Sequence, residues 1–361
     1  MKIQEIMQRI EGFAPLGLGL NWDNVGLLLG QRDWEVSKVY ITLDVTQTAV
    51  EAAIKAGCQL ILSHHPLIFR ALKGITDPIL IRLIQAQVAV ISLHTNLDVA
   101  ENGVNHALAR QLGLEVLSVL SEETGATYHH ISVYCPTGYE DRICQAAWEA
   151  GAGKTGNYHN CGTRHAVQGY FEAGEGARPF VTKPQNGYVE ETELEFNCDS
   201  FRLNGVIKAI QAAHPYQTPA LQHYPIANSN PAYGLGLICS IDGDLSLQQV
   251  AALVKQRLAC PHTKLWTAGM ALDSPVRRIA ICGGSGGSLV ASIASKADVF
   301  ISGDITYHTF LDSRIPLIDA GHFYTEYPAL QLLGSFVSTL GLEAQLMPAA
   351  EHEYGRYLQM V

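Results

Sequence analysis

Residues 58–66 read CQLILSHHP, an apolar run that ends in two histidines and a proline. A short apolar run between a glycine and a proline is typical of a buried strand, because proline interrupts regular structure. The preceding segment, 46–56, has helical apolar spacing, and a second apolar run, 88–93, is followed by HTNLD at 94–98. Strands that alternate with helices predict an α/β fold with a mostly parallel sheet covered on both faces.

The last third of the chain returns to this alternating pattern. A shift of 240 residues places Ile41 on Ile281 and His64 on Asp304. The match indicates two pseudo-repeated halves that would place their strand ends around one cleft. The alternative is that any two strand-helix-strand units match this well, because both need apolar strands and small residues in the turn. The expected strands are 276–282, 298–302, 315–319 and 343–347, with helices at 286–296 and 326–340.

The middle of the chain has a different pattern. Helix-like segments at 140–151 and 204–213 lie among alternating strands, which predicts a ferredoxin-like α+β insert. We therefore expect a discontinuous α/β domain made of residues 1–126 and 228–361, interrupted by an inserted domain at 127–227.

Composition excludes several classes of protein. The chain has 361 residues and a formal net charge of −10, without basic runs. We therefore expect neither sequence-independent nor sequence-specific binding of nucleic acid. No apolar run reaches the roughly 18 residues that a membrane helix needs, and polar residues interrupt the first apolar positions. We expect a cytoplasmic protein with no membrane partner.

Two adjacent histidines, His64 and His65, follow the first buried strand. The carboxyl ends of parallel strands open onto the crevice where ligands bind, and Asp98 follows the next strand by the same logic. Past a strand end, two imidazoles can diverge toward two ions. The alternatives are a hydrogen-bonded loop pair for the histidines and a helix N-cap for Asp98.

His322 and Glu326 lie in the sequence DAGHFYTEYP, residues 319–328. Their i, i+4 spacing suits one helix, but Pro328 fits best in a first turn. We therefore expect Thr325 as the N-cap, His322 in the loop before it, and Glu326 in the first turn, where its carboxylate could bridge two cations. The alternative for Glu326 is an ordinary first-turn glutamate.

Three imidazoles and two carboxylates thus share one predicted layer. Mixed nitrogen and oxygen ligands favour Zn, Fe, Mn, Co or Ni over Ca or Mg. Five ligands exceed what one catalytic zinc usually takes, so two ions roughly 3.5–4 Å apart are expected. The expected ligands are His64, His65, Asp98, His322 and Glu326.

Further polar residues are candidates for catalysis and substrate binding. Asp304 and His308 follow another strand and are candidates for proton transfer, as is His94, which could instead be a ligand or hold one. The run GGSGG at 283–287 either cradles a phosphate, through residues that include Gly284 and Ser285, or forms a tight turn. A turn-like segment expected to line the cleft holds Trp22, Asp23 and Asn24.

Taken together, these motifs resemble the family of GTP cyclohydrolase I type 2 homologues, the NIF-three-like dinuclear metal proteins. The resemblance covers roughly residues 1–125 and 230–361, and the middle is similar to the PII- or CutA-like insert of longer members. It implies the same five metal ligands with Glu326 as the bridge. It also implies toroidal homohexamers with metal sites facing an inner cavity that the inserts cap. The matching motifs are Trp22 to Gly26, Ser63 to Leu67, His94 to Asp98, Gly303-Asp304 with His308, and Gly321-His322 with Glu326.

Two functions from different classes follow. The first is a metal-dependent hydrolase that uses a metal-activated water on a nucleotide-like or phosphorylated small molecule, with GTP cyclohydrolase-type ring opening as one version. The second is a non-catalytic ring scaffold, stabilised by metal, whose insert senses a ligand or docks a partner.

Overall fold

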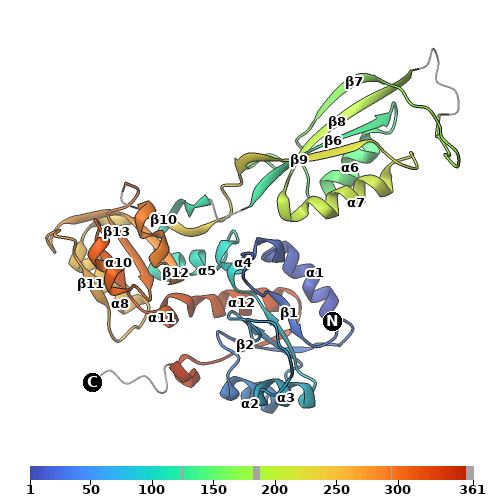
Figure 1. Ribbon diagram of the computed structural model, residues 1–361. Coiled ribbons are helices and arrows are strands. Elements are labelled where there is room, and N and C mark those ends of the chain that lie inside the picture. The colour runs from blue at the N-terminus through green and yellow to red at the C-terminus, as the bar shows by residue number, and fades with distance from the viewer. Residues whose placement is uncertain (123–125, 182–187, 294, 355–361) are drawn as a thin grey trace. The chain divides into compact units, whose positions relative to one another are not determined.

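The computed structural model describes residues 1–122, 126–181, 188–293 and 295–354 (Figure 1). The chain divides into two compact units. One unit comprises Met1–Gly125 and Ala232–Val361, and the other is Ala126–Pro231. None of the helices in the described ranges is long and apolar enough to cross a membrane.

The first unit contains a five-stranded sheet with the order β1-β4-β3-β2-β15. Only β1 runs antiparallel to its neighbour. Its strands are β1 (Gly26–Leu29), β2 (Lys38–Thr42), β3 (Leu60–Ser63), β4 (Ala89–Ser92) and β15 (Glu343–Leu346). Strands β3 and β4 are buried along their whole length, as expected of parallel strands with helices on both faces.

Helices cover both faces of this sheet. Helices α2 and α3 pack against Tyr40, Ile61 and Val90, and α12 contacts β2 and β15. Thr46 caps α2 by accepting a hydrogen bond from the N–H of Ala49. The helices of this half are α1 (Ile3–Phe13), η1 (Leu16–Leu18), α2 (Gln47–Lys55), α3 (Pro78–Ala86), α4 (Thr95–Val99), α5 (Val104–Leu112) and α12 (Pro328–Thr339).

The same unit contains a second sheet of six strands, with the order β11-β14-β13-β12-β10-β5. Here only β12, β13 and β14 are mutually parallel. The strands are β5 (Glu115–Ser121), β10 (Leu235–Ser246), β11 (Lys264–Trp266), β12 (Pro275–Ser285), β13 (Val299–Gly303) and β14 (Leu317–Asp319). The other helices of the unit are α8 (Leu247–Arg257), η4 (Gly287–Leu289), α9 (Val290–Ile293), α10 (Tyr307–Asp312), α11 (His322–Glu326) and η5 (Ala349–Glu351).

The expectation of a mostly parallel sheet needs correction, because the fold is a mixed α/β one with separate sheets. Strand β5 precedes the middle segment and β10 follows it, and the two pair antiparallel. A chain that leaves a sheet and returns beside its own exit runs in opposite directions in the two strands. Each of the two sheets nevertheless contains three neighbouring parallel strands in chain order, β2-β3-β4 and β12-β13-β14, and the first adds β15 as a fourth.

The second unit is a four-stranded antiparallel sheet with the order β7-β8-β6-β9. One face packs its apolar side chains, such as Val133 and Phe196, against Ile143 and Ile210 from the two helices. Figure 1 shows both helices on that face. The elements are β6 (Thr127–Pro136), α6 (Glu140–Glu149), β7 (Thr163–Gly169), β8 (Val189–Asp199), η3 (Ser200–Arg202), α7 (Leu203–Ala213) and β9 (Leu221–Ser229).

Candidate metal centre

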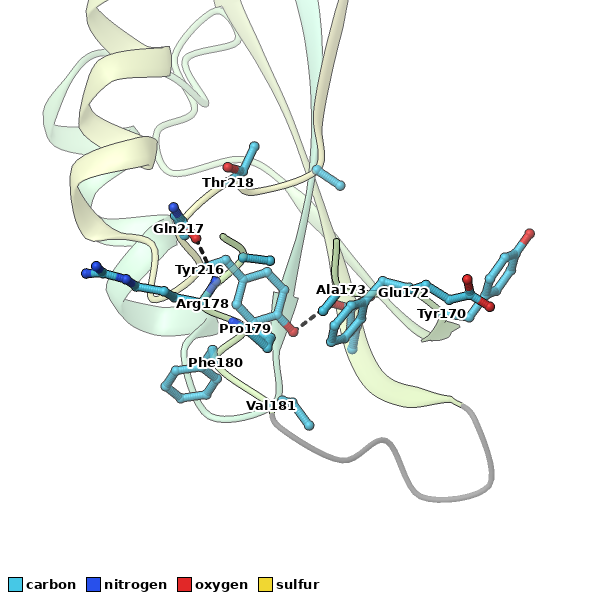
Figure 2. Close-up of a pocket in the computed structure, with 14 residues that line it drawn as sticks. Tyr170, Glu172, Ala173, Arg178, Pro179, Phe180, Val181, Tyr216, Gln217 and Thr218 are labelled. Atoms are coloured by element: carbon cyan, nitrogen blue, oxygen red, sulfur yellow. Dashed lines mark hydrogen bonds between the residues drawn. The ribbon is translucent and has the colours of Figure 1, made fainter. Parts of the chain in front are cut away.

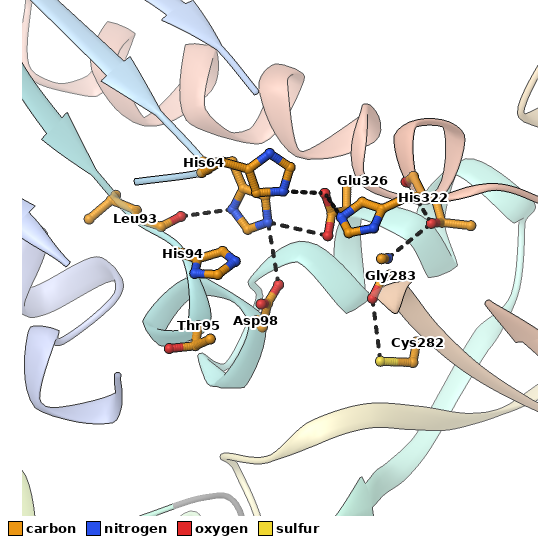
Figure 3. Close-up of polar contacts among 12 residues, drawn as sticks. His64, Leu93, His94, Thr95, Asp98, Cys282, Gly283, His322 and Glu326 are labelled. Atoms are coloured by element: carbon orange, nitrogen blue, oxygen red, sulfur yellow. Dashed lines mark hydrogen bonds and ion pairs between the residues drawn. The ribbon is translucent and has the colours of Figure 1, made fainter. Parts of the chain in front are cut away.

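Polar side chains from both sheets of the first unit meet at one point (Figure 3). His64 and His65 follow β3, and Asp98 lies in α4 after β4. His322 and Glu326 lie in α11, directly after β14. The apolar strands are held by the two cores, so their carboxyl ends bring these polar residues together.

Glu326 lies at the centre of the cluster. Its Oε2 is 3.0 Å from Nε2 of His65 and 3.1 Å from Nε2 of His322. Its Oε1 is 3.6 Å from Nε2 of His64, which in turn is 3.6 Å from Oδ1 of Asp98. All five expected ligands are therefore neighbours. Three of them, His64, His65 and Glu326, offer ligand atoms within 4.8 Å of one another, a group that can hold a metal ion.

The other ring nitrogen of each of these histidines is held by a second group. Such anchoring fixes the ring and leaves Nε2 directed at the cluster, as in metal-binding histidines generally. The Nδ1 contacts are His64 to the carbonyl oxygen of Leu93 at 2.8 Å, His65 to Asp44 Oδ1 at 2.8 Å, and His322 to Asp304 Oδ2 at 2.7 Å.

Buried atoms of the cluster lack hydrogen bonds. Among the described residues, Nε2 of His64, Nε2 of His322 and Oε2 of Glu326 make no hydrogen bond of good geometry, although the imidazoles lie 3.0–3.6 Å from the Glu326 carboxylate. A buried polar atom left without a partner costs about 1–3 kcal/mol, more if charged. A cation shared by these atoms would satisfy them together. The nitrogen and oxygen donors also suit a transition metal, so the residues present fit such an ion.

The pKa values reflect how strongly the cluster favours positive charge. Burial disfavours the charged form of His65, but contacts with Asp44 and Glu326 outweigh it and raise the pKa to about 10. At His322, burial lowers the pKa, but contacts with Glu326 and Asp304 outweigh it and raise the pKa to about 9. Glu326 is fully buried, yet His64 and the other imidazoles hold its pKa well below the usual value. Burial raises the pKa of Asp98 to about 7.

Gly284 provides space beside the cluster. Its φ is +64°, and a Cβ there would overlap Oε1 of Glu326 and lie 3.2 Å from Nε2 of His322. A side chain at this position would displace a ligand, so glycine is required by both conformation and space.

The glycine-rich run does not form the turn expected from the sequence. Strand β12 continues through Ser285 and pairs it with Gly303. Three N–H groups of this run are occupied, so they are not available to cradle a phosphate, and Ser285 is exposed on the strand. The N–H of Gly283 donates to Asn105 Oδ1, that of Gly284 to Thr325 Oγ1, and that of Gly286 to Ser302 Oγ.

The expected loop position of His322 is also wrong. His322 and Glu326 lie one turn apart on α11, at the i, i+4 spacing. Pro328 begins a separate helix, α12, whose first turn requires no proline N–H. The hydroxyl of Thr325 donates to the carbonyl oxygen of Gly321 instead of capping a helix. Two consecutive helices therefore accommodate the proline and keep both candidate ligands on one face.

The expected substrate residues Trp22, Asp23 and Asn24 divide into two roles. Asp23 accepts from Nδ1 of His94 at 2.9 Å, and Asn24 Nδ2 donates to the carbonyl oxygen of Ile68 at 2.5 Å. The side chains of Asp23 and Asn24 therefore hold neighbouring parts of the protein in place. Trp22 is 58% exposed, and its ring centroid is 6.1 Å from that of His94.

His94 and His308 have different surroundings. The His94 ring lies 5.4 Å from His64 and 5.5 Å from His65. His308 is exposed on α10, where its ring contacts Tyr307 and not the cluster.

Asp44, which holds His65, was not singled out from the sequence, although it also follows a strand and could have been found by the same rule.

Comparisons with known proteins agree along almost the whole chain. The family model Duf34/NIF3 (NGG1p interacting factor 3) matches residues 1–350. A Staphylococcus epidermidis protein named GTP cyclohydrolase 1 type 2 homolog is 35% identical over 336 residues, which cover 91% of this chain and 90% of the relative. A Halalkalibacterium halodurans protein of the same name is 33% identical over 329 residues, 88% of each chain.

Solved structures show the same similarity. A Bacillus cereus protein related to NIF3 superposes with a TM-score of 0.79 at 32% identity, covering 96% of each chain. A Staphylococcus aureus protein superposes with a TM-score of 0.74 at 29% identity, covering 100% of this chain and 99% of the other. The family model, the curated relatives and these structures together establish that the chain belongs to the Duf34/NIF3 family.

Proposed function

We propose that this protein is a dinuclear metal-dependent hydrolase that acts on a nucleotide-like or phosphorylated small molecule. The observation that carries the proposal is the set of buried Nε2 and carboxylate atoms that converge within 3.0–3.6 Å of one another, several of them without a well-formed hydrogen bond. Such atoms are costly unless a cation joins them. The proposed ions are two of the metals Zn, Fe, Mn, Co or Ni.

The two oxygens of Glu326 support a division of the ligands into two sets. Oε1 faces His64, which also faces Asp98, whereas Oε2 faces His65 and His322. Each set would hold one ion, with Glu326 as the bridge. Bound ions of this kind acidify a water molecule so that it can attack a substrate at neutral pH.

His94 is the proposed proton acceptor. Burial lowers its pKa, as does the charge of His64, so the imidazole is neutral at neutral pH and able to take a proton. Asp23 holds its Nδ1, and its ring centroid lies 5.4 Å from that of His64. Asp304 acts through His322, whose ring it orients. His308 is left out of the proposed machinery because its side chain is exposed.

A nucleotide-like substrate is supported by aromatic residues near the cluster. Trp22 and Phe69 are both exposed, with ring centroids 5.9 Å apart, and Trp22 is next to His94. Exposed aromatic faces stack on planar rings. The name GTP cyclohydrolase 1 type 2 homolog of the relatives supports the same substrate class.

We also propose a homohexamer whose middle unit is of the ferredoxin-like, PII- or CutA-like type. The antiparallel order β7-β8-β6-β9, with both helices on one face, supports that assignment. Sedimentation equilibrium of the full chain tests the assembly, and a monomer would contradict it.

Metal content is the first test of the proposed reaction. Protein purified without chelator or affinity tag is expected to contain about two transition-metal ions per chain by mass spectrometry. A content near zero that added Mn, Fe, Co and Zn do not raise contradicts the metal centre.

A substrate panel then tests hydrolysis. GTP and simple phosphoesters are assayed with the metal-loaded protein and with His94→Gln. Loss of turnover with metal retained supports the role of His94. If the loaded protein hydrolyses none of the panel, the non-catalytic scaffold becomes the better description.

A further inference from the structure

The unit Ala126–Pro231 contains a cavity of about 290 Å³ (Figure 2). It lies between the segment that follows β7 and the segment that joins α7 to β9. All of its lining residues belong to this unit, whereas all the candidate metal ligands belong to the other. Its volume is near the lower end for small-molecule sites, which suits a single ring system with one substituent.

A buried histidine holds one wall of the cavity in place. His214 follows the last residue of α7, and its Nε2 donates to the carbonyl oxygen of Tyr134 at 2.9 Å. Its Nδ1 accepts from the N–H of Tyr216 at 3.0 Å. The Tyr216 hydroxyl donates to Oε1 of Glu191 at 2.7 Å. The Tyr216 ring is therefore fixed before any ligand arrives, which reduces the ordering cost of binding.

Aromatic side chains around this wall remain exposed. The Phe180 ring lies 6.0 Å from Tyr216 and 5.5 Å from Tyr139, yet Phe180 is 49% exposed. Phe171, which also lines the cavity, is exposed as well. Aromatic surface left in water beside a preformed cavity favours a planar ring as the occupant.

Charged and polar groups complete the cavity. The N–H of Arg178 donates to Gln217 Oε1 at 3.0 Å, which joins the two segments. Arg178 is exposed, and within the described part of the chain its guanidinium has no carboxylate partner and Oε2 of Glu191 receives no hydrogen bond. The cavity thus offers an unpaired cation for an anionic group and a carboxylate oxygen for ring N–H donors.

We infer that this cavity is a binding site for a small heteroaromatic compound with N–H donors on its ring and one anionic arm. The ring stacks on Tyr216 and Phe180, its N–H group donates to Glu191, and the anionic arm pairs with Arg178. Both a purine mononucleotide and an indole amino acid have this chemistry. The inference is independent of the proposed hydrolase, because it assigns a second site whose residues take no part in the metal centre.

Titration calorimetry on the full-length protein tests the site with guanosine 5′-monophosphate, guanosine and L-tryptophan as separate probes. At least one anionic probe is expected to bind with a Kd below about 1 mM. Arg178→Gln is expected to weaken that binding by about tenfold or more, because it removes a charge-assisted contact. Tyr216→Leu is expected to remove it. The matched control is Arg142→Gln, an exposed arginine on α6 outside the cavity, which leaves binding unchanged.

The outcomes separate this site from the metal centre. Binding of the monophosphate but not of guanosine or tryptophan identifies a nucleotide, and binding of tryptophan alone identifies an amino acid. His322→Ala is expected to leave this binding intact. Binding that His322→Ala abolishes and Arg178→Gln spares would place the ligand at the metal centre and overturn the inference. Failure of both anionic probes to bind would overturn it as well.

Discussion

Two clusters of histidine and glutamate in this protein have similar composition but different surroundings. In the metal centre, His64 is fully buried and the Glu326 side chain is 5% exposed. In the unit Ala126–Pro231, Glu195 lies 3.3 Å from both His130 and His165, but its side chain is 29% exposed.

Hydrogen bonding separates the two clusters further. Oε2 of Glu195 accepts from the hydroxyl of Thr163 at 2.7 Å, and Nδ1 of His130 lies 3.1 Å from Asn197 Oδ1. The Glu195 cluster is thus hydrogen-bonded and partly exposed to solvent. Oε2 of Glu326 and Nε2 of His64 have no such partner among the described residues. Residue type is therefore similar in the two clusters, and burial distinguishes the candidate metal centre.

The largest expected effect is at the central glutamate. Glu326→Gln removes the negative charge that both sets of candidate ligands share. Metal affinity is therefore expected to fall by more than about 100-fold, a larger loss than is usual when a residue that only orients a ligand is changed. Glu195→Gln is the matched change in the exposed cluster. Metal content by mass spectrometry after dialysis is expected to be lost in the first variant and unchanged in the second. Equal retention in both would remove the distinction between the clusters.

Asp304→Asn tests the groups that orient the ligands. The neutral amide lacks the negative charge with which the carboxylate orients and polarises the His322 imidazole. Metal affinity is therefore expected to fall by about 10- to 100-fold. Competition with a chromophoric chelator measures this change. Asp312→Asn, an exposed aspartate on α10, is the control. If both variants bind metal equally well, Asp304 does not position His322.

Acid is expected to weaken the cavity wall that His214 holds in place in the unit Ala126–Pro231. Burial lowers the pKa of His214, and this outweighs the opposite influence of Glu191. Because the folded pKa lies below the unfolded value near 6.5, its contribution to stability is present above about pH 6.5 and is lost as the pH falls further. The protection factor of the Tyr216 N–H, which is the intrinsic exchange rate divided by the observed one and so corrects for the slower intrinsic exchange in acid, is expected to fall between pH 7 and pH 5. His214→Gln, which does not titrate, should reduce that dependence, and an unchanged dependence would assign it elsewhere.

The smallest expected effect is on stability at the exposed cluster. Glu195→Gln weakens two partly exposed contacts to histidines, and such pairs contribute about 0–1 kcal/mol. Urea unfolding is expected to show a change within that range. A loss of several kcal/mol would mean that the Glu195 cluster is a structural centre and not a solvated face.

Part of the site could be predicted without coordinates. His64, His65 and Asp98 follow apolar runs, and the strand ends bring these side chains close together as expected. His322 and Glu326 were also chosen, although their local structure was not predicted correctly. The orienting residue Asp44 was missed although it follows a strand too, and only its contact with His65 in the structure shows which imidazole it reaches.

The sequence by itself determined the apolar segments, the change of pattern near residues 127 and 227, and the polar residues at the strand ends, since these depend on local spacing. The tertiary structure alone decided that the strands of the first unit form two mixed sheets. It also decided that α11 ends before Pro328 and that Gly284 leaves room beside Glu326. Sheet partners, burial and the absence of hydrogen-bond partners depend on contacts between residues far apart in the chain. Those long-range contacts convert a list of histidines and carboxylates into a site that favours a cation.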